Sequence, residues 1–187
     1  MYKLCKTQQS ATRQRQLELG LLQAMLEQHY EEVSVSDLCD RMQIPRKSFY
    51  RYFSGKDGAL RALIDHTLLE FQEVFGEPVT THSQIHAQLE KFFLFWVRNK
   101  ELLDALAQSN IRGVLIERAI THALNDYTLV HHFTDENRFM TTVAATRFAV
   151  CGLMSIVLSW HDDNFKTSIS QMTDIAVEIM TNPLYKI

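Results

Sequence analysis

The segment IPRKSFYRYF, which runs from Ile44 to Phe53, constrains what this chain can fold into more than any other. It places three cations and four aromatic rings in a stretch that suits one short helix. Ile44 and Phe49 would face a core. The side chains left to face outward are Arg46, Lys47, Ser48, Tyr50 and Tyr52. This pattern suits the DNA major groove, where arginine and lysine reach guanine edges and tyrosine hydroxyls bond phosphates. The alternative is an ordinary charged surface helix.

The residues upstream favour the DNA-binding interpretation. Ser34 can cap the amide of Asp37, as in a capping box, which predicts a short helix that ends near Met42. The next residues leave room only for a tight turn, and Pro45 suits the first turn of a second helix. The result is a helix-turn-helix. An amphipathic helix over residues 12–29 can cover the pair.

The chain from Arg13 to Leu68 resembles the N-terminal DNA-binding domain of the TetR/AcrR family of bacterial transcriptional regulators. The residues that carry the resemblance are Ser34-Val35-x-Asp37-Leu38, Ile44, Phe49-Tyr50-x-Tyr52-Phe53 and Lys56-Asp57. Three positions depart from the family pattern. Gln43 replaces the usual glycine of the turn, Pro45 replaces serine or threonine, and Lys47 replaces glycine or alanine. We expect Gln43 to adopt the left-handed conformation that glycine takes without cost.

The motif and the resemblance together predict a set of DNA-contacting residues. The predicted set is Ser36, Arg46, Lys47, Ser48, Tyr50, Arg51, Tyr52 and Lys56. Of these, Arg46, Lys47, Ser48 and Arg51 are expected at base edges or nearby phosphates, and the others at phosphates. The DNA-binding domain is predicted to span residues 1–55, and a helical effector-binding and dimerisation domain residues 56–187.

The distribution of charge supports a nucleic-acid partner, although the net charge of −3 does not. Residues 1–61 hold ten Lys/Arg against seven Asp/Glu, a balance of +3, whereas residues 62–187 have a balance of −6. Counterion release would therefore favour DNA binding at the first part of the chain. Lys3, Lys6, Arg13 and Arg15 form a further basic group. This group is either an arm that follows phosphates or a solvated tail.

The second part of the chain predicts more helices, and the last two are unusually apolar. The helices around 136–160 and 168–181 carry more apolar surface than one small domain needs. Small residues such as Ala144, Ala149 and Gly152 allow close helix contact. Two such helices and their copies would form a four-helix bundle, so we predict a homodimer on a near-palindromic operator. The alternative is that these helices form the core of a monomer.

The resemblance implies a ligand pocket in the second domain, and the aromatic run near Phe92 is consistent with one. The predicted lining residues are Phe92, Phe95, Trp96, Leu103, Leu106, Phe148, Met154 and Trp160. Few charges fall on these faces, so the effector is predicted to be apolar or aromatic. For each single residue, an ordinary core position is the alternative.

Other features argue against a membrane, a metal and catalysis. The N-terminus lacks the apolar core of a signal peptide, and Arg147 and Ser155 interrupt the longest apolar stretches. The odd number of distant cysteines suggests a reducing, cytoplasmic location. His82, His86 and Glu90 have a metal-binding spacing, but a solvated helix face explains them better. The sequence contains no phosphate loop, nucleophile elbow or HExxH motif, so neither an enzyme nor a cofactor is expected.

These observations predict an all-α protein with an N-terminal three-helix DNA-binding domain and a C-terminal helical ligand-binding and dimerisation domain. Its predicted function is a ligand-responsive transcriptional regulator that acts as a homodimer, with repression as the expected mode. Two alternatives remain. One is a DNA-binding protein that recruits a protein partner and has no small-molecule effector. The other is a helical small-ligand-binding or enzymatic protein whose basic helix is incidental.

Overall fold

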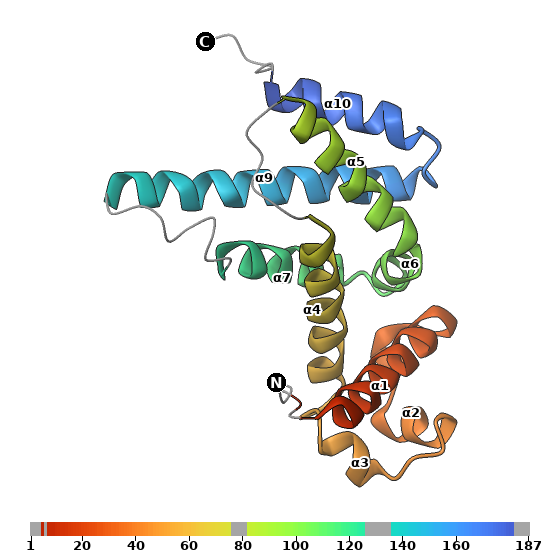
Figure 1. Ribbon diagram of the computed structural model, residues 1–187. Coiled ribbons are helices and arrows are strands. Elements are labelled where there is room, and N and C mark those ends of the chain that lie inside the picture. Colours follow the sequence, from red (N-terminus) through yellow and green to blue (C-terminus); the bar gives the residue numbers. More distant parts are fainter. Residues whose placement is uncertain (1–4, 6, 76–81, 126–135, 182–187) are drawn as a thin grey trace. The chain divides into compact units, whose positions relative to one another are not determined.

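The computed structural model describes residues 5, 7–75, 82–125 and 136–181. Within these residues the elements are helices, which confirms the predicted all-α fold (Figure 1). In chain order they are α1 (Gln8–Glu27), the 3-10 helix η1 (Tyr30–Glu32), α2 (Val35–Arg41), α3 (Arg46–Tyr50), α4 (Lys56–Phe75), α5 (His82–Arg98), α6 (Lys100–Gln108), α7 (Arg112–Asn125), α9 (Glu136–Asp162) and α10 (Ile169–Thr181).

The chain forms two compact units that are interleaved in sequence. The first unit comprises Met1–Leu68 and Glu101–Ala119, and the second comprises Leu69–Lys100 and Ile120–Ile187. α6 and the first half of α7 therefore belong to the same unit as α1, α2 and α3. The division into residues 1–55 and 56–187 stays a prediction.

The first unit is built around the predicted helix-turn-helix. Ser34 accepts a hydrogen bond from the amide of Asp37 at 3.1 Å, so the predicted cap of α2 is present. The largest fully buried side chains of the unit include Leu17, Met25 and Phe49. Leu17 and Met25 lie on α1, and Phe49 lies on α3. Their burial holds α3 against α1 and α2, because apolar area removed from water stabilises the packed arrangement.

The turn between α2 and α3 requires an unusual backbone conformation. Gln43 has φ 53°, as expected from its place in the turn. The amide of the next residue, Ile44, donates to the carbonyl of Cys39 at 3.0 Å, which closes the turn. A side chain at positive φ is strained, because its Cβ approaches the following carbonyl oxygen.

Gln43→Gly is expected to raise the free energy of unfolding by about 0.5–1 kcal/mol. Glycine removes the Cβ strain at positive φ. The greater conformational entropy of glycine in the unfolded chain offsets part of this stabilisation. Urea unfolding followed by circular dichroism measures the change. Gln43→Ala is the matched control, because alanine retains Cβ and should give no such gain. Equal stabilisation by both variants would show that the strain is not the cause.

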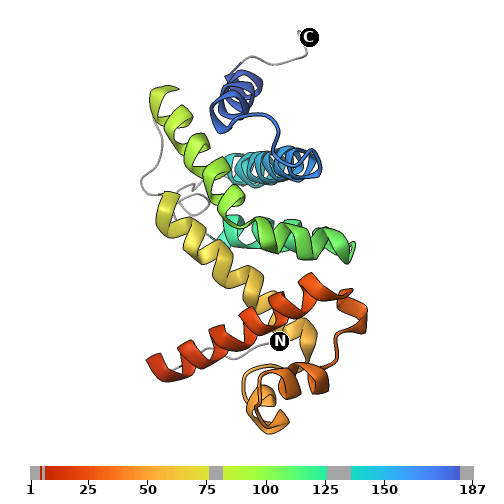
Figure 2. The same cartoon turned by 90° about the vertical axis from the view of Figure 1, so that its right-hand side faces the viewer.

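The second unit has an aromatic core formed by α5, α9 and the loop between α9 and α10. Figure 2 shows α5 and α10 side by side. Phe93 of α5 and Trp160 of α9 meet edge to face, with ring centroids 5.6 Å apart. The indole N–H of Trp160 also donates to the carbonyl of Thr167 at 3.0 Å. This bond fixes the chain reversal between α9 and α10.

The outer faces of α9 and α10 leave large apolar side chains exposed. Phe148 is 83% exposed and Met140 is 61% exposed on α9, and Ile175 and Met180 are 45% and 53% exposed on α10. Exposed apolar residues of this size on adjacent elements are typical of an interaction surface.

α9 also has the length and composition of a membrane span. Its segment Met140–Asp162 has a mean hydropathy of 1.6, and 11% of the apolar window is buried within the chain. Arg147 and Ser155 interrupt this segment, as the sequence analysis noted, and its mean hydropathy is nevertheless in the range of a span. One helix of this kind does not by itself distinguish a membrane span from a helix whose apolar face another protein chain covers.

Candidate nucleic-acid interface

The short helix α3 exposes cations to solvent on one face and buries the aromatic side chain of Phe49 on the other. Phe49 is fully buried and packs against Phe53, with ring centroids 5.2 Å apart. Arg46 and Lys47 are exposed, and Tyr50 is 53% exposed with its ring against the edge of Phe49. Packing on one face of the helix therefore fixes which side chains the other face offers.

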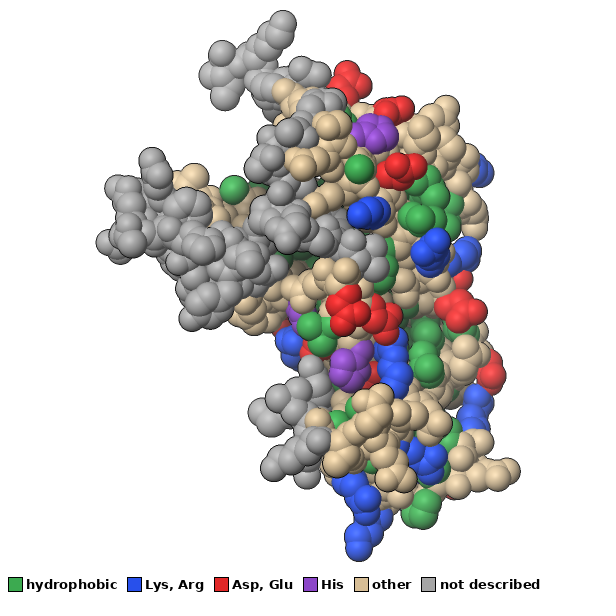
Figure 3. Space-filling model, in the orientation of Figure 1, with side chains coloured by type: hydrophobic (Ala, Val, Ile, Leu, Met, Phe, Trp, Pro, Cys, Tyr) green, Lys and Arg blue, Asp and Glu red, His purple; other side chains and the backbone are tan. Residues whose placement is uncertain are grey.

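The exposed cations of α3 are not neutralised locally. Among the described residues, Arg46, Lys47 and the following Arg51 form no ion pair with a carboxylate. On the face shown in Figure 3, basic side chains lie over the end of the first unit that contains α3. Positive charge without a local partner is what a polyanion such as DNA can neutralise. Of the remaining predicted contacts, Ser36 and Ser48 are partly exposed.

Tyr52 does not face outward as the sequence analysis expected. It is only 8% exposed, because α3 ends at Tyr50 and the chain then turns inward. Its amide donates to the carbonyl of Phe49 at 3.0 Å, and its ring lies beside Phe53. The helical spacing that assigned Tyr52 to the outer face therefore no longer applies two residues beyond the end of the helix.

Lys56 anchors the start of α4 to the 3-10 helix η1. Its Nζ donates to the carbonyls of Tyr30 at 2.8 Å and of Glu31 at 3.0 Å, and lies 4.5 Å from the centre of the Tyr30 ring. The Tyr30 hydroxyl in turn donates to Asp57. Burial raises the pKa of Tyr30 above its usual range, and the hydrogen bond to Asp57 raises it further, so the phenol keeps its proton. This positioning role of Lys56 was missed in the sequence, where only its phosphate contact was predicted.

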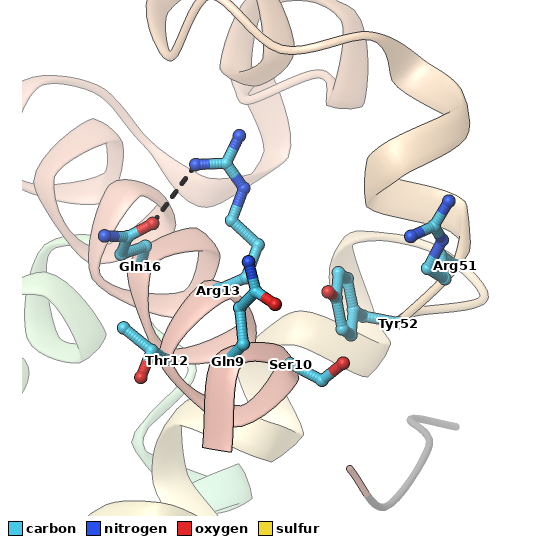
Figure 4. Close-up of a pocket in the computed structure, with 7 residues that line it drawn as sticks. All are labelled: Gln9, Ser10, Thr12, Arg13, Gln16, Arg51 and Tyr52. Atoms are coloured by element: carbon cyan, nitrogen blue, oxygen red, sulfur yellow. Dashed lines mark hydrogen bonds between the residues drawn. The ribbon is translucent and has the colours of Figure 1, made fainter. Parts of the chain in front are cut away.

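A polar groove lies beside α3 in the first unit. It encloses about 600 Å³, and the side chains that line it come from the N-terminal half of α1 and from the residues that follow α3 (Figure 4). The lining residues are Gln9, Ser10, Thr12, Arg13, Gln16, Arg51 and Tyr52. The sequence analysis identified Arg13 only as part of a basic group. The uncharged lining residues gave no sequence signal, because polar residues near a helix start are ordinary.

The predicted ligand-lining residues do not all come together. In the second unit Phe92, Phe95 and Trp96 are buried in one aromatic cluster, which Phe71 joins with its ring centre 5.2 Å from that of Phe95. Met154 and Trp160 are also buried in this unit, as the prediction requires. Leu103 and Leu106 are buried in the first unit instead, and Phe148 is exposed. Whether these residues line a ligand pocket stays a prediction.

His86, one of the residues considered as a metal ligand, has another partner. Nε2 of His86 lies 3.0 Å from a carboxylate oxygen of Asp174, which joins α5 to α10. In the part of the chain that the structure describes, no group of three or more histidine, cysteine or acidic side chains has an arrangement for a metal ion.

Comparison with known proteins matches the helix-turn-helix to a family. The model of the family described as "Bacterial regulatory proteins, tetR family" matches residues 22–63, a segment that contains α2 and α3. This match confirms the predicted resemblance to the TetR/AcrR family. No curated protein matches the chain.

Two solved structures are similar over most of the chain. The fatty acid degradation regulator FadR from Bacillus halodurans has 14% sequence identity and a TM-score of 0.64, with 92% of this chain and 96% of that chain covered. A transcriptional regulator of the TetR/AcrR family from Thermobifida fusca has 16% identity and a TM-score of 0.49, with 94% and 100% covered. At this identity the likeness to FadR shows a shared fold.

Proposed function

We propose that this protein, whose helix-turn-helix segment matches the TetR family, is a sequence-specific transcriptional regulator that binds an operator as a homodimer. The observation that carries the proposal is the exposed cationic face of α3 on its buried anchor Phe49, within the segment that the family model matches. Side chains at the start of a recognition helix are placed to meet base edges in the major groove. Such a regulator acts where the DNA is, which for a bacterial protein is the cytoplasm.

The exposed apolar faces of α9 and α10 support the homodimer. A second copy would cover Phe148, Met140 and Ile175 on both chains at once, because a two-fold interface buries the same patch twice. A dimer would also present two copies of α3, so the operator is expected to contain two near-palindromic half-sites. A membrane would cover the same face of α9 but would give no reason for a second recognition helix.

We also propose that a small ligand regulates DNA binding, with repression in its absence. The aromatic cluster of Phe92, Phe95 and Trp96 supports an apolar or aromatic effector. The indole N–H of Trp96 is buried and has no hydrogen-bond partner among the described residues, a state that costs free energy unless an acceptor meets it. The effector therefore carries a hydrogen-bond acceptor on its apolar body. To regulate, it must bind more tightly to one of two states of the protein.

Arg46→Ala is expected to weaken binding to the operator by about 1–3 kcal/mol and to relax the base preference at one position. Selection of sites from a random duplex pool at near-physiological salt first defines the operator, and a binding titration then compares the variant. A near-palindromic consensus supports the dimeric regulator. Recovery of no consensus by the wild-type protein would contradict the proposed function. An unaltered base preference in Arg46→Ala would show that another residue reads the operator.

The alternative without an effector predicts a different result on the same operator. A protein that only recruits a partner through its acidic second part should stay bound in the presence of every apolar compound tested. Release of the operator by one compound class, measured by fluorescence anisotropy, favours the ligand-responsive regulator.

A further inference from the structure

The side chain of Met42 lies directly against the backbone of α1. A Cβ added to Gly20 would lie 2.4 Å from the Met42 Sδ and 3.0 Å from its Cε, closer than real Cβ atoms approach. Gly20 stands inside a 20-residue helix, where glycine is less stable than alanine. The glycine leaves open the space that the thioether fills, and the contact depends on the apolar shape of that thioether.

Met42 also connects α2 to the turn that precedes α3. Its amide donates to the carbonyl of Leu38 at 3.1 Å, and the next residue, Gln43, has the left-handed φ of 53°. The turn is closed at Ile44, and α3 begins two residues later. The contact between Met42 and Gly20 therefore holds this short turn, and with it the position of α3, against α1.

Met42 differs from the other described methionines in its exposure. Three of these are buried, so their sulfur atoms are out of reach of solutes: Met25, Met154 and Met172. Met140 and Met180 are 61% and 53% exposed, so an oxygen added there would enter a side chain that already meets water within the single chain. Met42 and Gly20 are both half-buried, so their contact lies at the edge of the surface. A small solute can reach this sulfur, and a change in its polarity alters a packing contact.

From these observations we infer that Met42 is a site of oxidation by peroxides, and that its oxidation weakens DNA binding. The second part rests on the proposed function, because it needs an operator. With hydrogen peroxide, a lone pair of the Met42 sulfur attacks one oxygen, the O–O bond breaks and an S–O bond forms. The sulfur loses two electrons, and the other oxygen takes up the released proton and leaves as water. The product is a sulfoxide, which is polar where the thioether was apolar.

The sulfoxide is not compatible with the contact to Gly20. The sulfur already touches the backbone of α1, and the amides inside a helix are bonded to its own carbonyls. The new oxygen would therefore be buried without a hydrogen-bond donor, which costs free energy. The oxidised side chain turns away from α1 into water, and the turn that it held becomes free to move. DNA binds the fraction of molecules in which α3 is correctly placed, so the apparent affinity falls with that fraction.

The test measures operator affinity by fluorescence anisotropy before and after treatment with hydrogen peroxide. Each treated sample is then incubated with a thiol reductant, which reverses sulfenic acids and disulfides of the cysteines but leaves methionine sulfoxide in place. We expect the treated wild type to bind about tenfold more weakly. A methionine sulfoxide reductase should restore its affinity.

Three variants assign the effect to one sulfur atom. Met42→Leu retains an apolar side chain of similar volume and should bind equally before and after peroxide. Met42→Gln places a polar group on Gly20 without any oxidant and should bind about tenfold more weakly from the start. The matched control replaces both exposed methionines, as Met140→Leu with Met180→Leu, and should lose affinity on oxidation as the wild type does.

The possible failures are distinguishable. If the untreated wild type selects no operator, the proposed function fails and the effect on DNA binding fails with it. Oxidation of Met42 is then still tested by mass spectrometry of its peptide and by urea unfolding, where the wild type should lose stability and Met42→Leu should not. If the wild type binds an operator but Met42→Leu loses affinity on oxidation to the same extent, Met42 is not the site. Loss of the sensitivity in the variant of Met140 and Met180 would place the effect on α9 and α10 and would also overturn the inference.

Discussion

Replacing Arg118 by alanine is expected to lower the free energy of unfolding by about 3–5 kcal/mol. Arg118 of α7 donates two hydrogen bonds to the carboxylate of Asp65 of α4, at 2.6 and 2.7 Å. The side chain of Asp65 is 1% exposed and that of Arg118 is 21% exposed. Removal of the guanidinium leaves a buried carboxylate without its main counter-charge. Urea unfolding at neutral pH measures the loss.

Two controls distinguish the cost of leaving the buried carboxylate of Asp65 unpaired from the cost of losing an ordinary ion pair. Arg61 and Glu117 also join α4 to α7, but they lie 4.0 Å apart with side chains 45% and 61% exposed. Arg61→Ala should therefore change stability by less than about 0.5 kcal/mol. A double variant, Asp65→Leu with Arg118→Leu, should lose far less than Arg118→Ala alone, because no charge is left buried. A loss below about 1 kcal/mol for Arg118→Ala would show that the ion pair contributes little.

Phe148→Glu is expected to raise the dissociation constant of the proposed homodimer at least about a hundredfold. Phe148 is 83% exposed at the middle of the apolar face of α9, where a second copy would bury it. A glutamate at this position would have to lose its hydration when the two faces meet. Analytical ultracentrifugation over a range of protein concentrations gives the dissociation constant, and circular dichroism shows whether the helices persist.

Leu19→Glu is the matched control for this experiment. Leu19 is 44% exposed on α1, so its replacement makes the same change from an apolar to an acidic side chain on an element of the first unit. The control should remain a dimer. A wild-type protein that is monomeric at every concentration, or a Phe148→Glu variant that stays dimeric, would contradict the assignment of this face.

Local features of the sequence predicted the DNA-binding segment well. The cap at Ser34, the left-handed turn residue Gln43 and the buried anchor Phe49 each depend on residues close together in the chain. Their conformations are determined by backbone geometry and by apolar spacing, which a sequence displays directly. Tyr52 was misplaced because the same spacing was extended past the end of α3.

Contacts between distant segments could not be predicted. Asp65 and Arg118 are separated by 53 positions, and nothing in either neighbourhood identifies the other as a partner. The groove at Arg13 likewise depends on how α1 crosses the end of α3. The exposed position of Phe148 was also missed, because the apolar composition of α9 does not indicate which of its faces the chain itself covers.

Because the two units are interleaved in sequence, the unit that contains the helix-turn-helix cannot be isolated as one continuous N-terminal fragment. A fragment that stops at Leu68 would lack α6 and the first half of α7, and with them the hydroxyl of Ser109 that accepts from the amide of Tyr30 at 2.9 Å. It would also leave the carboxylate of Asp65 without Arg118. A chimera that joins the first unit to a different ligand-binding domain must therefore include residues 101–119 together with residues 1–68.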